Sequence, residues 1–191
     1  MRPRSPRVQS TLSGRNKKRR ILTVKEIVLF AMLGALMVAS KYAMEFLPNV
    51  HMLGAFIVSE TVVFRKKALY PVYIFVFLIG LFNGFALWWV PYLYIWAVLW
   101  GAVMLLPRRI PQKAKPFVYA GVSALHGLLY GTLYAPMQCL LFGTPLRSIP
   151  AWILAGLPWD CVHAAGNLAI GFLIVPMIFL LEKAKNGVGA G

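Results

Sequence analysis

The run VKEIVLFAMLGALMVASKYAMEFL at residues 24–47 decides the class of this protein, because residues 27–40 within it carry no charge. An α-helix rises about 1.5 Å per residue, so about 20 such residues cross the hydrocarbon core of a bilayer. Apolar residues follow one another here without the alternation of a membrane β-strand. The run therefore predicts a transmembrane helix, which Pro48 ends.

Five further apolar runs follow along the chain. Of all residues, 60% are hydrophobic and 13% are charged, which is about half the charged share of a soluble domain. The last run is longer than one span needs, and Pro158 and Pro176 are expected to bend it. The second run is short and is either tilted or re-entrant. We predict an all-α integral membrane protein, a six-transmembrane-helix bundle over residues 23–185, with the later spans at 51–64, 68–85, 88–106, 117–142 and 150–181.

Positive charge predicts the orientation of these spans. Eighteen of the 20 Lys and Arg residues lie in the segment up to Lys25, in residues 65–67, in residues 108–115 and near the C-terminal end. Alternate connections are therefore basic, and basic connections stay in the cytoplasm. This pattern places both termini in the cytoplasm and residues 48–50, 86–87 and 143–149 outside. We expect a multi-pass protein of a bacterial-type plasma membrane.

The net charge of +15 does not predict nucleic-acid binding, because the charges form short clusters between apolar runs. Residues 1–22 are expected to form a basic cytoplasmic tail without fixed structure, and residues 186–191 a flexible C-terminal tail. No phosphate-binding loop, HExxH or GxSxG motif occurs in the sequence. We therefore expect neither an enzyme nor a cofactor or metal site, and the two cysteines, Cys139 and Cys161, are interpreted as small apolar residues.

Ionisable residues inside spans are costly, so each calls for a partner or a role. Lys41 and Glu45 share a helix face and form either an ion pair or the mouth of a ligand site. Glu60 is expected to pair with residues 65–67 or to contact a partner protein. Asp160, His163 and Asn167 share one face of the last span, at a depth that His126 also reaches. They form either a polar network between helices or the floor of a solute site.

Aromatic and amide residues gather toward the predicted outer side. Tyr130, Tyr134 and Gln138 form a stripe above His126. An interfacial aromatic belt or a ligand-facing wall explains the tryptophans equally well. Apolar walls with few polar anchors are typical of small-molecule sites. The candidate solute-binding residues are Asn83, Trp88, Trp89, Tyr92, Tyr134, Gln138, Trp152, Asp160 and His163.

Small residues form a stripe on the first span, where Ala31, Ala35 and Ala39 are spaced four apart. Such a stripe lets another helix approach closely, either from this chain or from a partner.

Together with this topology, three stretches resemble the substrate-binding S component of energy-coupling factor (ECF) transporters. They are the stripe from Ala31 to Ala35, the turn FLPNVH at residues 46–51, and GLPWDCVH at residues 156–163, which carries a P-x-D-x-x-H pattern. The resemblance covers nearly all of the chain after Thr23. The basic N-terminal tail departs from the family pattern.

This resemblance implies a subunit that captures a vitamin-like solute from outside. It also implies docking on a transmembrane T component, which two cytosolic ATPase subunits drive. By the same resemblance, Ala31, Ala35 and Ala39 form the docking face, and Pro48, Asn49 and His51 belong to a lid. The alternative is a six-helix membrane scaffold without a ligand, of the kind found in cell-shape machinery. An occluded cavity in the outer half would favour the solute-binding subunit, if it were lined by Asn83, Tyr92, Tyr134, Gln138, Trp152 and Asp160. A filled core would favour the scaffold.

Overall fold

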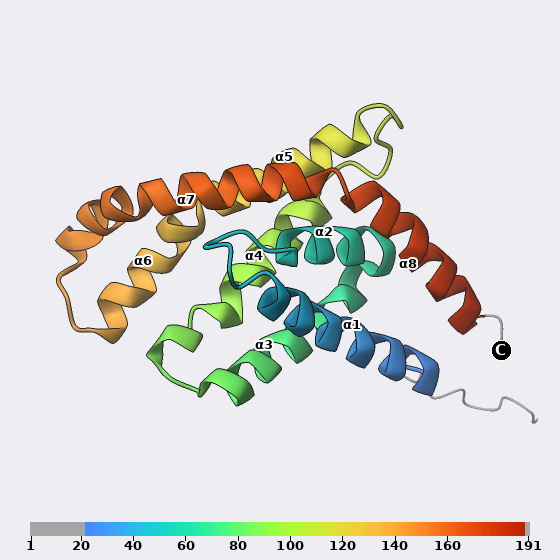
Figure 1. Ribbon diagram of the computed structural model, residues 1–191, viewed down its shortest axis with the longest axis horizontal. Helices are drawn as coiled ribbons and strands as arrows, with labels where there is room; N and C mark the ends of the chain where they lie inside the picture. Colours follow the sequence, from blue (N-terminus) through green and yellow to red (C-terminus); the bar gives the residue numbers. More distant parts are fainter. Residues whose placement is uncertain (1–21, 190–191) are drawn as a thin grey trace, which may run out of the picture.

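The computed structural model describes residues 22–189, and this part is helical with no strand (Figure 1). Most of the predicted tail at residues 1–22 lies outside the described residues. The C-terminal helix continues to Gly189, past the start of the tail predicted at residue 186. The α-helices are α1 (Val24–Ala43), α2 (Leu53–Phe64), α3 (Leu69–Asn83), α4 (Tyr92–Leu105), α5 (Lys115–Leu128), α6 (Tyr130–Leu141), α7 (Ile149–Gly171) and α8 (Ile174–Gly189). Short 3-10 turns are η1 (Arg65–Ala68), η2 (Leu87–Trp89) and η3 (Leu146–Ser148).

Helix α2 lies at the centre of the molecule, between α1, α4 and α8 (Figure 1). All of its residues except Val62 are buried. A helix that is apolar on every side is stable only when other helices surround it. Its 12 residues rise about 18 Å, which is shorter than the hydrocarbon core of a bilayer.

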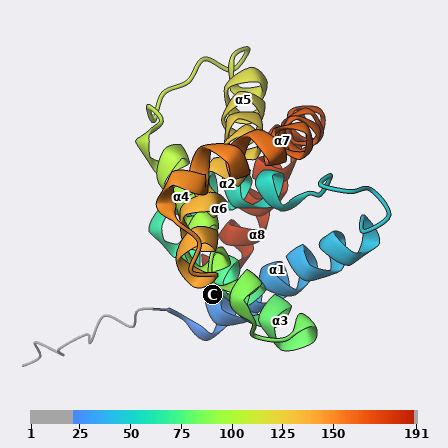
Figure 2. The ribbon, with the colours of Figure 1, turned by 90° about the vertical axis from the view of Figure 1, so that its left-hand side faces the viewer.

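Helices α1 and α3 pack side by side (Figures 1 and 2). A capping box begins α1, in which the Thr23 hydroxyl accepts from the backbone N–H of Glu26 at 3.2 Å and the Glu26 carboxylate accepts from the Thr23 N–H at 3.0 Å. The two helices touch at Gly34, where a Cβ atom would lie only 2.5 Å from the Ile74 side chain. Glycine is therefore the residue that fits at this crossing.

Helices α5 and α7 form the second close pair (Figures 1 and 2). A Cβ atom on Gly171 would lie 2.6 Å from the Ala120 Cα, and one on Gly127 would lie 3.1 Å from the backbone of α7. Asn167 reaches across and donates to the Ser123 carbonyl at 3.0 Å. Small residues and one amide thus hold these helices together, as is common in membrane bundles.

Two of the six predicted spans are broken. The run 117–142 divides at Leu129 into α5 and α6. The run 150–181 bends by 57° between the stretches Leu146–Gly171 and Ile174–Gly187. Pro176 explains this bend, because it has no N–H to donate to the carbonyl of Phe172. Pro158 lies within α7, which continues through it.

Several basic connections lie together at one end of the molecule. Lys67 forms an ion pair with Glu26 at the start of α1. Arg65 reaches the Met104 carbonyl at the end of α4, at 3.4 Å. Lys185 of α8 donates to the Val63 carbonyl at the end of α2, at 2.9 Å. The first, second and last basic clusters of the sequence therefore share one end of the fold.

The described part holds two stretches that are long and apolar enough to cross a bilayer, Val24–Ala43 and Leu87–Leu105. The bent pair of Leu146–Gly171 and Ile174–Gly187 makes a third if it counts as one span. Large apolar side chains also stand exposed on several helices, among them Met32, Phe77, Leu154 and Phe179. Exposed apolar surface of this extent is typical of contact with a membrane or another protein. The helical fold is confirmed, with two to three candidate spans.

Candidate functional site

A cavity of about 180 Å³ lies beneath the loop that joins α1 to α2. The loop supplies one wall, which includes all three predicted lid residues, Pro48, Asn49 and His51. Tyr92 of α4, Tyr130 of α6 and His163 of α7 supply the opposite wall, and Lys41 and Glu45 stand at the α1 end. Four helices and one loop thus border a space with aromatic, imidazole and charged side chains around it.

The loop stands apart from the helices over much of its length (Figure 2). Two turns give it shape, because the N–H of Leu47 donates to Met44 at 2.9 Å and the N–H of Val50 donates to Leu47 at 3.2 Å. Asn49 lies at φ 57°, a left-handed conformation that asparagine tolerates better than most residues. At its far end, Val50 packs where a Cβ on Gly166 would come within 3.0 Å, so the loop rests directly on α7.

All three histidines of the chain meet in one aromatic cluster behind this cavity. The ring of His51 lies 4.8 Å from that of His163, and His163 lies 5.1 Å from Tyr130. Trp96, which is almost fully buried, lies 5.8 Å from His126 and 5.6 Å from Tyr92. Most of these contacts are edge-to-face, the arrangement that the charge distribution of aromatic rings favours.

Several nitrogens of this cluster are buried without a hydrogen-bond partner among the described residues. They are His51 Nδ1, His126 Nδ1, His163 Nε2 and Trp96 Nε1. His126 Nε2 lies 3.0 Å from the Ile95 carbonyl, so this nitrogen is the donor, and in the neutral ring Nδ1 is an acceptor with nothing to accept. Buried polar atoms nearly always have partners, so this group of four calls for an explanation.

Of the nine predicted solute-binding residues, Tyr92 and His163 line the cavity. Trp88 and Tyr134 lie next to it, because the Tyr134 hydroxyl donates to the Trp88 carbonyl at 2.9 Å and the Trp88 ring lies 5.6 Å from Tyr92. Gln138 on α6 is half-buried, and Trp152 on α7 is 44% exposed. Neither of these two lines the cavity.

Trp89 and Asn83 serve the packing of the α3 end instead. The Trp89 indole donates to the Val76 carbonyl at 2.8 Å and covers Gly80, where a Cβ would lie 2.7 Å from its Nε1. Asn83 accepts from the Tyr42 hydroxyl at 3.0 Å, which ties the end of α3 to the end of α1.

Asp160 is buried and accepts hydrogen bonds from the backbone N–H of Gly131, at 3.0 Å and 3.1 Å. This carboxylate therefore caps the start of α6 from a neighbouring helix. Within the described part, Asp160 forms no hydrogen bond with His126 or His163. The interhelical interpretation of Asp160 is the one that its contacts favour.

Two other ionisable groups differ from expectation. Lys41 and Glu45 do not form an ion pair in the described part of the chain, and Lys41 instead lies 5.7 Å from the Tyr42 ring centre. Glu60 does not pair with residues 65–67, because it is fully buried in α2 and neither of its oxygens has a partner among residues 22–189. Residues 65–67 belong to η1, which follows α2, and Lys67 pairs there with Glu26.

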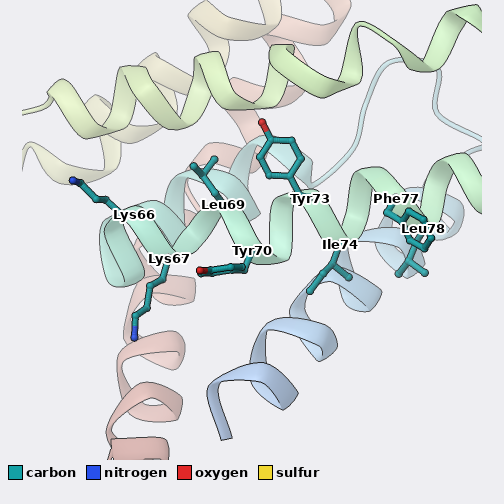
Figure 3. Close-up of a pocket in the computed structure, with 8 residues that line it drawn as sticks. All are labelled: Lys66, Lys67, Leu69, Tyr70, Tyr73, Ile74, Phe77 and Leu78. Carbon is teal, nitrogen blue, oxygen red and sulfur yellow. The ribbon is translucent and has the colours of Figure 1, made fainter. Parts of the chain in front are cut away.

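The predicted docking face is exposed. Ala31, Ala35 and Ala39 all lie on the open side of α1. Ala35 and Ala39 line an apolar groove of about 540 Å³ between α1 and α3, together with Leu78 and Phe82. Leu78 also lines a second groove of about 650 Å³ along α3, where Tyr70, Tyr73, Ile74 and Phe77 follow Lys66 and Lys67 (Figure 3).

The sequence left Trp96 between an aromatic belt and a ligand-facing wall, and neither Trp96 nor Tyr130 was among the candidate solute-binding residues. Trp96 is one helical turn beyond Tyr92, and Tyr130 is one turn beyond His126. Residues four apart share a helix face, so this spacing is the signal by which both residues could have been found.

Among the described residues, no group of three or more His, Cys, Asp or Glu side chains is placed to hold a metal ion. Comparison of the chain with models of known families, with curated proteins and with solved structures found no match.

Proposed function

We propose that this protein is the solute-binding subunit of an ECF-type importer, a six-span membrane protein with both termini in the cytoplasm. It captures a small vitamin-like solute from outside and docks on a T component that two ATPase subunits drive. The observation that carries the proposal is the cavity beneath the loop at residues 44–52, which three helices line with Tyr92, Tyr130 and His163.

The distribution of charge supports the orientation. The ion pair between Lys67 and Glu26 and the bond from Lys185 to Val63 gather basic segments at one end of the fold. Basic segments are retained on the cytoplasmic side. The loop over the cavity follows the opposite end of α1 and would then face outside, where the solute arrives.

The exposed alanine face of α1 supports docking. Ala31, Ala35 and Ala39 leave a shallow apolar surface, and a groove lies directly beside it. Small side chains allow the backbone of a partner helix to approach closely within a bilayer. The cavity and this groove share no lining residue, so the two proposed functions can be tested by separate mutations.

A ligand-free scaffold is the second candidate, and the packing around Asp160 and Trp89 favours it. Both side chains form hydrogen bonds within the chain, as expected of a structural helix bundle. The scaffold offers no reason for a cavity that is lined by imidazoles without partners.

The test is to purify the full chain from cells grown in rich medium, denature it and identify released small molecules by mass spectrometry. The importer subunit should release one compound in near-stoichiometric amount. A matched preparation of a Cys161→Ser variant, altered at an exposed α7 position, should release the same compound. If the chain releases nothing and no vitamin in a panel raises its unfolding temperature, the scaffold is the better account.

A further inference from the structure

We infer that the solute of this site is a neutral, single-ring nitrogen heterocycle that carries both a hydrogen-bond donor and an acceptor, such as an amino- or amide-substituted pyridine or pyrimidine. The inference rests on the proposed function and narrows it to one chemical class. Four properties of the cavity support it: size, wall chemistry, charge and unmet hydrogen bonds.

The size of the cavity limits the solute to about one ring. Its volume is about 180 Å³. A cavity of about 150 Å³ in another protein holds benzene, whereas sites for drug-sized ligands occupy about 300–1,000 Å³. A fused two-ring compound such as a purine would exceed this volume and extend beyond the side chains that line the cavity.

The walls favour a flat ring. Tyr92, Tyr130, His51 and His163 supply aromatic surfaces from four different parts of the chain. Tyr130 and His163 meet at an interplanar angle of 62°, and His51 and His163 meet at 75°. Rings that cross at such angles offer both faces and edges to a planar guest, which gains stacking and edge contacts that an aliphatic solute cannot form.

The charges favour a neutral guest. The charged residues among those lining the cavity are Lys41 and Glu45, which have opposite signs and stand together at the α1 end. The aromatic residues of the lining are phenols and imidazoles, which supply no fixed charge to pair with an ion. A charge that loses its water without gaining a partner is strongly disfavoured, so a carboxylate or ammonium on the inner part of the solute would weaken binding.

The unmet hydrogen bonds favour a solute with mixed polarity. His51 Nδ1 and His163 Nε2 have no partner among the described residues and are sealed from solvent in this conformation. A neutral imidazole has one donor and one acceptor nitrogen, so two such rings require complementary groups on the guest. Because His51 belongs to the loop, opening of the loop or rotation of the rings would present these nitrogens to an entering solute.

The experiment has two parts. The first identifies the compound that is bound to the full chain after purification in detergent. In the second, the bound compound is removed by mild denaturation and refolding, and a panel of probes is added. The two probes expected to bind are nicotinamide and 4-aminopyrimidine. Three comparison compounds each change one property: benzamide lacks the ring nitrogen, nicotinate carries a charge, and adenine has a second ring. We expect the first two to raise the unfolding temperature. Benzamide should bind at least about tenfold more weakly, as the loss of one buried hydrogen bond predicts. Nicotinate should bind more weakly because its charge has no partner, and adenine because its second ring exceeds the cavity.

His163→Phe keeps a ring and removes both nitrogens, so it should weaken binding of nicotinamide by about tenfold. His163→Gln keeps an amide that donates and accepts, and it should recover part of that loss. This pair keeps the test informative even if one variant folds poorly. Cys161→Ser on the exposed side of α7 is the matched control and should bind as the unmodified chain does.

The outcomes separate the two proposals. Release of a neutral single-ring heterocycle, with the expected order in the panel, supports both. Stoichiometric release of an anionic, two-ring or acyclic compound overturns the inference on solute class and leaves the importer subunit standing. A chain that releases nothing and responds to no probe or vitamin overturns both.

Discussion

The carboxylate of Asp160 on α7 accepts hydrogen bonds from the backbone N–H of Gly131, with both oxygens within 3.1 Å. Gly131 is the second residue of α6, where backbone N–H groups have no partner within their own helix. The negative charge also lies at the positive end of the helix dipole. One side chain thus stabilises the break between α5 and α6 and fixes that break against α7.

Removal of this cap is expected to destabilise the fold. Asp160→Ala should lower the free energy of unfolding by about 1–2 kcal/mol, in the range of helix caps, and Asp160→Asn should cost less because its amide oxygen still accepts. Unfolding temperatures in detergent check this order. Equal stability of all three chains would show that the contact contributes nothing.

Gly131→Ala should be destabilising for a specific reason. The new Cβ would lie 2.4 Å from an oxygen of Asp160, so the carboxylate must move and lose its bonds. In the double variant with Asp160→Ala the clash is gone, so the two effects should not add. A double-mutant cycle measures this, and strict additivity would argue against the contact.

The α5–α7 pair should be sensitive to a single methyl group. A Cβ on Gly171 would lie 2.6 Å from the backbone of Ala120, which cannot move without separating the helices. Gly171→Ala should cost about 1–3 kcal/mol, as overpacking does. Gly156→Ala on the same helix meets nothing within 4 Å, and it should be neutral or slightly stabilising because alanine favours a helix. The comparison fails if both variants unfold at the same temperature.

Replacement of Glu60 by an apolar residue should stabilise the chain, which is an unusual result for a buried position. Its carboxylate is fully buried and has no hydrogen-bond partner among the described residues. A buried polar group without a partner costs about 1–3 kcal/mol. Glu60→Met should therefore raise the unfolding temperature, and Glu45→Gln at an exposed position should leave it unchanged. A strong loss of stability in Glu60→Met would instead point to a partner that Glu60 binds.

The docking face should be separable from the solute site. Ala35→Leu adds bulk to the exposed side of α1, beside the groove that Leu78 and Phe82 complete. If the proposed importer assembly is right, this variant should reduce co-purification of a T component and ATPase subunits from membranes of the source cell and leave binding of the proposed solute intact. Leu36→Ala, at an exposed position next to Ala35, is the control. Unchanged co-purification of Ala35→Leu would place docking elsewhere.

Much of the fold could be predicted because it depends on apolar runs and on glycine and proline. Each of the six runs lies in helical structure, although two of them divide into two helices, and Pro176 explains the bend before α8. The break at Leu129 could not be predicted, because the contact that stabilises it joins Gly131 to the carboxylate of Asp160, 29 residues further along the chain. Hydropathy measures local apolarity and contains no information on such a contact.

The sequence indicates which helices carry aromatic and polar residues, but it does not indicate which of those residues line the cavity. The spacing from Tyr92 to Trp96 and from His126 to Tyr130 is present in the sequence. That His51 lies 6.1 Å from Trp96 is a contact between distant segments, which spacing alone does not give. The polar residues Asn83 and Asp160 looked like solute anchors, yet both have partners within the chain. A polar residue in a span requires a partner, and the sequence alone does not say whether that partner is the solute.

The most direct test of the central claim is the mass of the intact chain, measured by mass spectrometry from detergent under native and denaturing conditions. We predict one additional small mass in the native chain that denaturation removes. It should be absent from His51→Trp, whose larger ring fills the cavity beneath the loop, and present in the control Cys161→Ser. A native chain that carries no additional mass, even after incubation with a vitamin mixture, would contradict the claim that this cavity holds a solute.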